Sequence, residues 1–445
     1  MWWVISITLP TNEGNSKNRM YGMRYFRIRL YLLLSMAPCL TYAQWNSALT
    51  DTVPAGRYKA GISAIADYSS NSLTSAFAFS WLAGNYLNNT LKQQVSSLLG
   101  NNNRAGYEMN YGMYMVFCHD TAGKRKPLNF FVALRHKSYL NTSFTADDFQ
   151  VPFYGNAGYA GKTAQLSPFN FESLSYQQAE LGLVCTHFAG GAEFGAGLSF
   201  LAGQSYLAMQ LPSAGLYTSP TGESITINAD ALLMQSDTSA QGRNGINGAG
   251  GSLDLYFMVP YKLGGKNSSI SISLSDLGFI RWNNSSLQYR KDTSYTYNGV
   301  SINSLNDIKN LSFHSLAADS LQNRYFPYKK GGFYSAIPAV LELKSVTQFS
   351  SAFHLELGLC DMFNANAGAY FYAQSDFYFG SKWMTTFQAG YGGYAGINFA
   401  ASLCRQYRRS QWSLTLNRLQ GFVLPYRFGG AGAYVQYSLT FGKWQ

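Results

Sequence analysis

Three segments near the C-terminal end of the chain place charged or polar residues at every second position, between apolar residues. Carboxylate, ammonium, imidazole and amide groups at this spacing come to lie on one face of an extended chain. Gathered on one face, such groups can bind ions or guide a polar or amphipathic solute. The candidate site residues are Glu342, Lys344, His354, Glu356, Gln374 and Asp376.

Sequence motifs for covalent or metal chemistry are missing from this chain. None of the five histidines lies in an HExxH motif, and there is no GxSxG motif, phosphate-binding loop or dinucleotide fingerprint. No set of residues has the spacing of metal ligands. We therefore expect no enzyme activity, no metal and no cofactor. A serine–histidine site on barrel strands stays open as an alternative, because such sites are set by geometry and not by order in the sequence.

The elements that must position the candidate residues are β-strands, because the hydrophobic pattern has a period of two. In residues 367–379, Phe371 and Phe377 share one face, whereas Gln374 and Asp376 share the other. Segments of roughly 9–13 residues fit tilted membrane-spanning strands better than soluble strands. Further alternating segments are residues 57–68, 105–119, 128–138, 177–188, 192–202, 224–236, 251–261, 268–275, 351–360, 411–417 and 435–441.

The composition favours a barrel with one face in lipid. Charged residues make up 12% of the 445 residues, about half the share in an average soluble domain, and aromatic residues make up 16%. So many aromatic residues argue against disorder, and the lack of long apolar runs argues against a helical membrane protein. We predict an all-β fold, a closed transmembrane antiparallel β-barrel of about 14 strands. The net charge of +11 is scattered in short clusters, so we expect no nucleic-acid partner.

The alternation assigns an outer and an inner face to each strand. Two interpretations of the charged inner face stay open: a hydrated or salt-bridged interior, and a lumen that guides a solute. Residues expected to face lipid include Leu355, Leu357, Phe371, Leu414 and Leu439. Further charged residues expected inside are Arg57, Lys59, Glu108, Arg135, Lys137, Glu180, Glu193 and Asp254.

The alternation between outer and inner faces also makes two local predictions. Asp276 falls on the lipid-facing side, where a carboxylate is costly, so the strand should end or bulge near Ser275. Asp276 should then lie at the rim or fold inward. In the hairpin 340–360, a three-residue turn at 349–351 would place Lys344 directly opposite Glu356.

Three stretches break the alternation. Residues 85–99 place Leu87, Leu91, Val95 and Leu98 at helical spacing, which predicts a short amphipathic helix. Residues 139–172 and 303–336 are long and rich in aromatic residues, as functional loops often are. Glycines predict hairpin turns at 189–191 and 264–265. With a periplasmic C-terminus, the turns near 348–351, 380–382 and 405–410 are periplasmic and the loop 303–336 is extracellular.

The N-terminal segment has the pattern of an export signal. Three arginines precede an apolar run from Leu30 to Leu40, and Thr41-Tyr42-Ala43 follows as a cleavage site. We expect residues 1–43 to be a signal peptide, with 1–22 an over-extended start. Residues 44–445 should form a single barrel domain in the outer membrane. None of the cysteines expected to remain forms a CxxC pair, so we expect neither a disulfide scaffold nor a zinc site.

Several runs resemble an uncharacterised family, a domain of unknown function, of Bacteroidota outer-membrane proteins. They are Asp254-Leu255, residues 275–282 and 295–300, Gly155-Asn156, residues 159–161 and the glycine-rich C-terminal end. The family is similar in architecture to long-chain fatty-acid transporter barrels and to the type IX secretion shuttle barrel. The resemblance implies a 14-strand barrel with an N-terminal plug, and it carries over no ligand-binding residue.

Two functions are consistent with this sequence. The first is the binding or passage of a hydrophobic or amphipathic small molecule by a barrel surrounded by outer-membrane lipid. The second is a non-transport role, as an accessory or docking barrel for a secretion or surface complex. An open lumen with an apolar pocket would favour the first, and a plugged lumen under a flat aromatic surface would favour the second.

Overall fold

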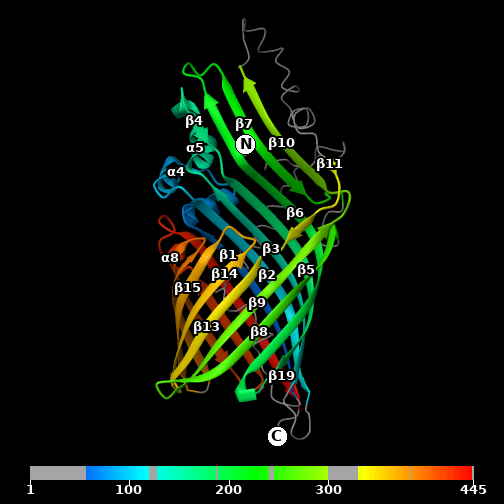
Figure 1. Ribbon diagram of the computed structural model, residues 1–445. Helices are drawn as coiled ribbons and strands as arrows, with labels where there is room; N and C mark the ends of the chain where they lie inside the picture. Colours follow the sequence, from blue (N-terminus) through cyan, green and yellow to red (C-terminus); the bar gives the residue numbers. More distant parts are fainter. Residues whose placement is uncertain are drawn as a thin grey trace, which may run out of the picture.

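The barrel is closed in the computed structural model, which describes residues 57–119, 128–186, 189–239, 245–298, 329–380 and 382–442. Within these residues, fourteen antiparallel strands form the wall, and β1 pairs with β19 to close it (Figure 1). The prediction of a closed barrel of about 14 strands is confirmed. In wall order the strands are β1 (Arg57–Ser70), β2 (Asn103–His119), β3 (Leu128–Phe144), β5 (Phe169–Cys185), β6 (Glu193–Thr218), β8 (Gly248–Leu263), β9 (Lys266–Trp282), β13 (Ala339–Ser350), β14 (Phe353–Phe363), β15 (Gly368–Phe379), β16 (Trp383–Gly393), β17 (Gly396–Gln406), β18 (Ser410–Asn417) and β19 (Gly429–Gly442).

Some sequence predictions fall on residues outside the described ranges. They include the expected signal peptide at 1–43, residues 303–328 of the long aromatic segment, residues 187–188 of the segment 177–188, and residue 381 of the turn 380–382. The structure describes the backbone of Cys118 but not its side chain, whereas Cys185, Cys360 and Cys404 are free thiols.

The barrel has two unlike ends (Figure 1). At the turn end, short turns join β8 to β9, β13 to β14, β15 to β16 and β17 to β18, and β19 finishes there. The predicted glycine turn at 264–265 is confirmed, with both residues at positive φ. At the other end, the sheet end, longer connections carry helices and extra strands. These are α3 (Ser75–Leu82), α4 (Asn89–Ser96), α5 (Ala146–Tyr154), β4 (Thr163–Gln165), β7 (Ile225–Gln235), β10 (Leu287–Tyr297), β11 (Lys329–Lys330), β12 (Tyr334–Ala336) and α8 (Leu419–Val423).

Strand β6 is 26 residues long and continues past the barrel wall at the sheet end. Residues 193–203 pair with β8, whereas residues 207–210 and 213–218 pair with β7, with an irregularity between Gln210 and Ser213. Strand β7 pairs in turn with all of β10, and this sheet rises above the barrel (Figure 1). The alternating segment 224–236 is therefore a strand, but it stands outside the barrel wall.

The helices lie at the sheet end, and the one predicted at 85–99 is shorter than the sequence predicts. In α4, Leu91 and Val95 are buried as expected, but Leu98 is exposed because the helix ends before it. Its start is set by Asn88, whose side chain accepts a hydrogen bond from the Leu91 amide. The segment 139–172 is not one long loop, since it contains the end of β3, α5 and β4. No helix among the described residues is both long and apolar enough to cross a membrane.

The outer wall of the barrel is apolar. Leu357 and Phe371 are 54% and 57% exposed, whereas their neighbours Glu356 and Tyr372 are buried inside the barrel. The assignment of the leucines and phenylalanines to the outer face of the barrel is therefore correct. Such alternation is the pattern of a barrel with lipid outside and polar groups inside.

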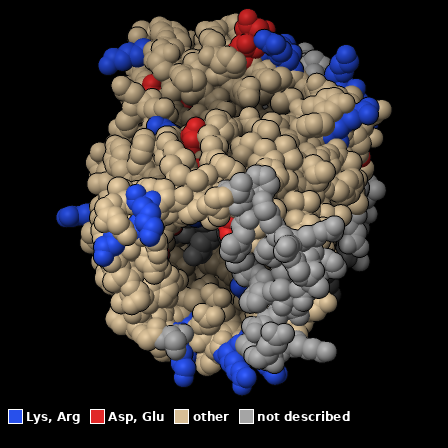
Figure 2. Space-filling model, turned by 60° about the horizontal axis from the view of Figure 1, so that its bottom comes forward, with Lys and Arg blue, Asp and Glu red and all other residues tan. Residues whose placement is uncertain are grey.

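Aromatic side chains on this outer wall lie against one another near the turn end. Rows of this kind mark the boundary of the hydrocarbon layer in transmembrane barrels. Figure 2 looks toward the turn end and shows a hollow there, with Lys and Arg side chains around its edge. The contacting pairs are Tyr58 with Phe441, Phe117 with Phe130, Phe353 with Phe377, and Trp383 with Trp412.

Candidate functional site

A bulge in β9 turns a carboxylate from the lipid side into the barrel. The register between β8 and β9 changes between Leu253 and Leu255, so Asp254 faces both Ser275 and Asp276. Asp276 takes a left-handed φ of 59° and is only 2% exposed. Aspartate tolerates this backbone conformation better than most residues do. The prediction that the strand bulges near Ser275 and that Asp276 folds inward is confirmed.

Asp276 is the centre of a buried polar group that we call the Asp276 cluster. Lys137 Nζ lies 2.5 Å from Asp276 Oδ2, and Gln178 Nε2 donates to Oδ1 at 2.8 Å. The backbone N–H of Asp276 donates to Asp254 Oδ1 at 2.5 Å. The ion pair joins β3 to β9, which are separated in the wall by β5, β6 and β8. Beside it, Arg135 of β3 forms an ion pair with Glu180 of β5.

Three of the candidate residues meet around a second centre, the Tyr372 cluster. The Tyr372 hydroxyl lies 2.8 Å from Glu342 Oε1 and 2.8 Å from Glu356 Oε1. Lys344 Nζ lies 3.8 Å and 4.0 Å from the same two carboxylates. Gly358 leaves room for the ring, because a Cβ there would lie 2.2 Å from Tyr372 Cζ. The cluster therefore balances two carboxylates with one ammonium and one shared hydroxyl.

The register predicted for the hairpin 340–360 is wrong by two residues. Lys344 pairs with Gly358, and Glu356 pairs with Val346. The turn is shorter than predicted, at residues 351–352, and an irregularity near Phe349 takes up the extra length. This register lets the Tyr372 ring cover Gly358, and Lys344 still reaches Glu356 along a diagonal. The prediction that Lys344 and Glu356 share a face is correct.

Of the other three candidate residues, Gln374 lies directly opposite Glu356, and His354 and Asp376 lie nearer the turn end. His354 and Asp376 are paired neighbours on β14 and β15, and the His354 ring lies 4.7 Å from the Tyr378 ring. Asp376 Oδ1 accepts hydrogen bonds from Thr386 at 2.8 Å and Gln374 at 3.2 Å. The six candidates thus form two adjoining groups on β13, β14 and β15.

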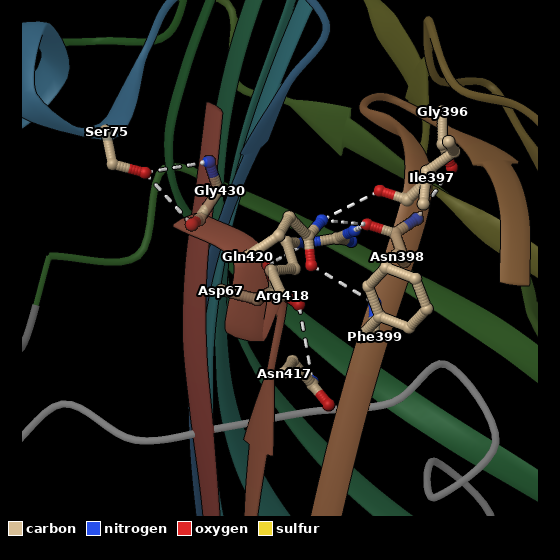
Figure 3. A network of polar contacts seen from close by, with 10 residues as sticks. All are labelled: Asp67, Ser75, Gly396, Ile397, Asn398, Phe399, Asn417, Arg418, Gln420 and Gly430. Atoms are coloured by element: carbon tan, nitrogen blue, oxygen red, sulfur yellow. Dashed lines mark hydrogen bonds and ion pairs between the residues drawn. The ribbon is translucent and has the colours of Figure 1, made fainter. Parts of the chain in front are cut away.

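A third network lies at the sheet end and is centred on Arg418, directly after β18 (Figure 3). Arg418 is 5% exposed and has a left-handed φ of 52°. Its Nε lies 2.7 Å from Asp67 Oδ1, and its Nη1 donates to Asn398 Oδ1 at 2.5 Å. One guanidinium therefore joins β1 to β17 across the inside of the wall.

Gln420 of α8 completes the wall where β18 has left β17 (Figure 3). Its Nε2 donates to the Ile397 carbonyl at 2.7 Å, and its Oε1 accepts from the Phe399 N–H at 3.1 Å. The side-chain amide thus takes the place of a missing strand for two backbone groups that would otherwise lack partners. We infer that α8 keeps the barrel wall closed at the sheet end.

A cavity, which we call the rim cavity, lies inside the barrel below this network. Its volume is about 30 Å³. Asp67, Glu108 and Arg418 form its charged edge. Asp67 and Glu108 are direct neighbours on β1 and β2, and Glu108 Oε1 is buried without a hydrogen-bond partner among the described residues. Its apolar lining includes Leu140, Pro338, Met362, Ala365 and Tyr394.

The rim cavity combines a charged edge with an apolar lining. None of the six candidate residues lines it. Asp67 is separated from Arg57 and Lys59 by an even number of residues, so all three lie on the same face of β1. The alternation of polar and apolar residues in β1 is therefore enough to place Asp67 on the inner face. Arg418 follows a strand end in a left-handed conformation, and no sequence pattern indicates its position. Within the described ranges, no group of three or more His, Cys, Asp or Glu side chains is placed to hold a metal ion.

Solved structures with similar folds have little sequence identity to this chain. The P. putida toluene transporter TodX aligns over 90% of this chain and 92% of its own, with 9% identity and a TM-score of 0.43. A Pseudomonas aeruginosa FadL homologue aligns over 92% of this chain and 96% of its own, with 11% identity and a TM-score of 0.40. The translocator domain of the autotransporter NalP from Neisseria meningitidis aligns over 89% of this chain and 92% of its own, with 7% identity and a TM-score of 0.35.

Comparison by sequence gives a family assignment. No curated protein matches the chain. The family model that matches is described as a family of unknown function, DUF5723, and it spans residues 53–413. Since these residues include nearly all the strands of the barrel, the chain belongs to the DUF5723 family.

Proposed function

We propose that this protein is an outer-membrane barrel that binds and passes a hydrophobic or amphipathic small molecule. The rim cavity carries the proposal, because it offers an apolar wall and a charged edge inside a barrel with an apolar outer surface. A closed barrel with such a surface is a stable way to cross a membrane. Short turns are typical of the periplasmic side, so the sheet end would be extracellular.

The order of groups along the lumen suggests a path. A molecule entering from the sheet end would reach the rim cavity before the Asp276 cluster, because Tyr139 precedes Lys137 on β3 in that direction. The cavity would shield the apolar body from water. Passage beyond it requires the polar groups of the deeper clusters to find new partners, which water in the lumen can supply.

Native mass spectrometry of the barrel extracted from its own membranes tests this proposal. We expect one small hydrophobic or amphipathic molecule per barrel, identified by its mass. Ala365→Trp fills the rim cavity and should abolish this bound species. Ala352→Trp makes the same change in an exposed turn and should retain it. A wild-type barrel that carries no such molecule, or an Ala365→Trp barrel that retains it, would contradict the proposal.

A second candidate function is docking to a secretion or surface complex. The sheet beyond the barrel favours it, because β10 pairs with β7 along its whole length but with β11 at only two residues in the described ranges. Strand edges of this kind can bind an extended segment of a partner protein. Co-purification of a protein that depends on β10, without any small molecule, would favour docking over passage.

A further inference from the structure

We propose that the exposed apolar side chains of α3 and α8 lie in the membrane leaflet at the sheet end, in contact with the acyl chains of its lipids. We call this surface the α3–α8 ridge. The inference concerns the outside of the wall and does not depend on what the lumen binds. The side chains of the ridge are Phe79, Trp81, Leu82, Phe422, Val423, Leu424 and Tyr426.

The composition of α3 is the first argument. This helix is apolar on its buried and on its exposed sides, since Phe77 is buried whereas Phe79 and Leu82 are exposed. The next helix, α4, has the usual pattern of a helix at a water surface, because it buries Leu91 and exposes Gln93. A helix that is apolar all round is normally covered by protein or by lipid.

Hydrogen bonds join α3 to the segment that follows α8. The Ser75 N–H donates to the Phe428 carbonyl at 2.9 Å, and the Ala76 N–H donates to the Pro425 carbonyl at 2.9 Å. The Ser75 hydroxyl also donates to the Gly430 carbonyl at 3.0 Å (Figure 3). The apolar side chains of the two segments therefore form one surface at the sheet end.

The lack of charge on the ridge is the second argument. Neither residues 68–91 nor residues 419–426 contain a charged side chain. Exposed apolar surface without charges marks a site that is covered by lipid or by another protein, and Val423 is 75% exposed. Trp81 and Tyr426 are of the two residue types that are enriched where a membrane meets water.

The ridge is continuous with the apolar outer wall, which favours lipid over protein as its covering. Tyr68 stands on the outer face of β1, because its neighbour Asp67 faces inward to Arg418. The Tyr68 ring lies 6.1 Å from the Phe79 ring of α3. On the other side, α8 is bonded to the backbone of Ile397, whose side chain is exposed on the outer wall. The lipid that surrounds the wall therefore reaches both parts of the ridge.

Spin labelling tests this position in the full barrel, in phosphatidylcholine vesicles, after every native cysteine has been replaced by alanine. Leu82→Cys and Val423→Cys each place one nitroxide on the ridge. Leu357→Cys is the lipid reference on the outer wall, and Gln93→Cys is the matched control, an exposed position on the neighbouring helix. Oxygen dissolves in lipid and a neutral nickel chelate stays in water, so the ratio of their collision rates with the label reports its surroundings.

We expect this oxygen-to-nickel ratio at Leu82→Cys and Val423→Cys to be severalfold higher than at Gln93→Cys and to approach that at Leu357→Cys. A ratio equal to that at Gln93→Cys would place the ridge in water and overturn the inference. Labels that neither reagent reaches would show that protein covers the ridge, such as a second copy of the chain, and would also overturn it. Heat-modifiable gel migration checks that each variant is a folded barrel.

Trp81 offers a second measurement that keeps the native cysteines. The fluorescence of Trp81 is the difference between wild type and Trp81→Phe. In vesicles whose acyl chains carry bromine, this difference should fall severalfold relative to unbrominated vesicles, because bromine quenches an indole only at contact. The corresponding difference for Trp282→Phe should not change, since the Trp282 ring is buried inside the barrel. A Trp81 difference that is equal in the two kinds of vesicle would overturn the inference.

Discussion

Asp276 combines two unfavourable features in a single residue. Its left-handed backbone costs about 1–2 kcal/mol for a residue with a side chain, and its carboxylate is almost fully shielded from water. Glycine would suit the backbone better but would leave the Lys137 ammonium without its carboxylate. The contacts with Lys137 and Gln178 therefore explain why an aspartate can stand at the bulge.

Removal of this carboxylate should destabilise the barrel strongly. Asp276→Asn keeps the shape and still tolerates the backbone conformation, but it leaves the Lys137 charge buried. We expect a loss of about 3–5 kcal/mol in the free energy of unfolding, measured by urea titration in phospholipid vesicles. Adding Lys137→Met should restore part of the loss, because no uncompensated ammonium then remains. Equal losses in the single and double variants would show that the ion pair is not responsible.

The Tyr372 hydroxyl should contribute measurably to stability. Tyr372→Phe removes the group that lies 2.8 Å from both Glu342 and Glu356, and it leaves two carboxylates with one ammonium. We expect a loss of about 1–3 kcal/mol in the same unfolding experiment. Tyr391→Phe, at a ring that is 67% exposed on the outer wall, is the control and should change stability little.

At the scale of elements, the alternation predicts where strands lie but not how they pair. Lipid on one side and polar groups on the other produce a period of two in most strands, although in β16 glycines such as Gly390 and Gly392 weaken it. The register of the β13–β14 hairpin depends on the Tyr372 ring of β15 packing over Gly358, which no property of the hairpin itself indicates. The rim cavity could not be predicted either, because Arg418 enters it from a connection between strands.

The α5 helix should be sensitive to pH. Its start is a capping box in which Thr145 N–H donates to Asp148 Oδ2 at 2.9 Å and the Thr145 hydroxyl accepts from the Asp148 N–H at 3.1 Å. Burial raises the pKa of Asp148 from 3.8 to about 6, although the hydrogen bonds from Thr145 oppose the shift. The folded protein therefore holds this proton more tightly than the unfolded chain does, so the contribution of Asp148 to stability is lost as pH rises from about 4 to about 6.

Hydrogen exchange measures this effect directly. After correction for intrinsic rates, protection of the α5 amides should decrease between pH 4 and pH 6 and then stay level. Asp148→Asn, which does not titrate, should give protection that is independent of pH over the same interval. A wild-type helix whose protection increases through that interval would contradict the assigned direction of the pKa shift.

For the molecule as a whole, the outer and inner faces should respond differently to charge. Leu357 faces outward at the middle of β14, so Leu357→Arg should lower the free energy of unfolding in bilayers by about 2–4 kcal/mol. Gln374→Arg introduces an arginine on the inner face of β15 and should lower the free energy of unfolding much less. Equal costs at the two positions, measured by urea titration, would contradict the assignment of lipid and lumen faces.

Export should remove the N-terminal segment. We expect the protein extracted from the outer membrane to begin at Gln44, as the arginines, the apolar run and the Thr41-Tyr42-Ala43 site predict. N-terminal sequencing of the purified protein checks this. A mature chain that still contains residues 30–40, or recovery of the protein in the soluble periplasm, would contradict it.

The length of β6 has a consequence for what approaches the cell from outside. Residues 207–218 of β6 extend for up to about 40 Å beyond the part that pairs with β8, and ten of these twelve residues pair with β7. In the orientation proposed above, this sheet would stand among or above the sugar chains of the surface glycolipid. A bacteriophage, an antibody or a host protease would then meet β7 and β10 long before it reached the mouth of the barrel, so selection by such agents would act on the sheet and leave the lumen unaffected.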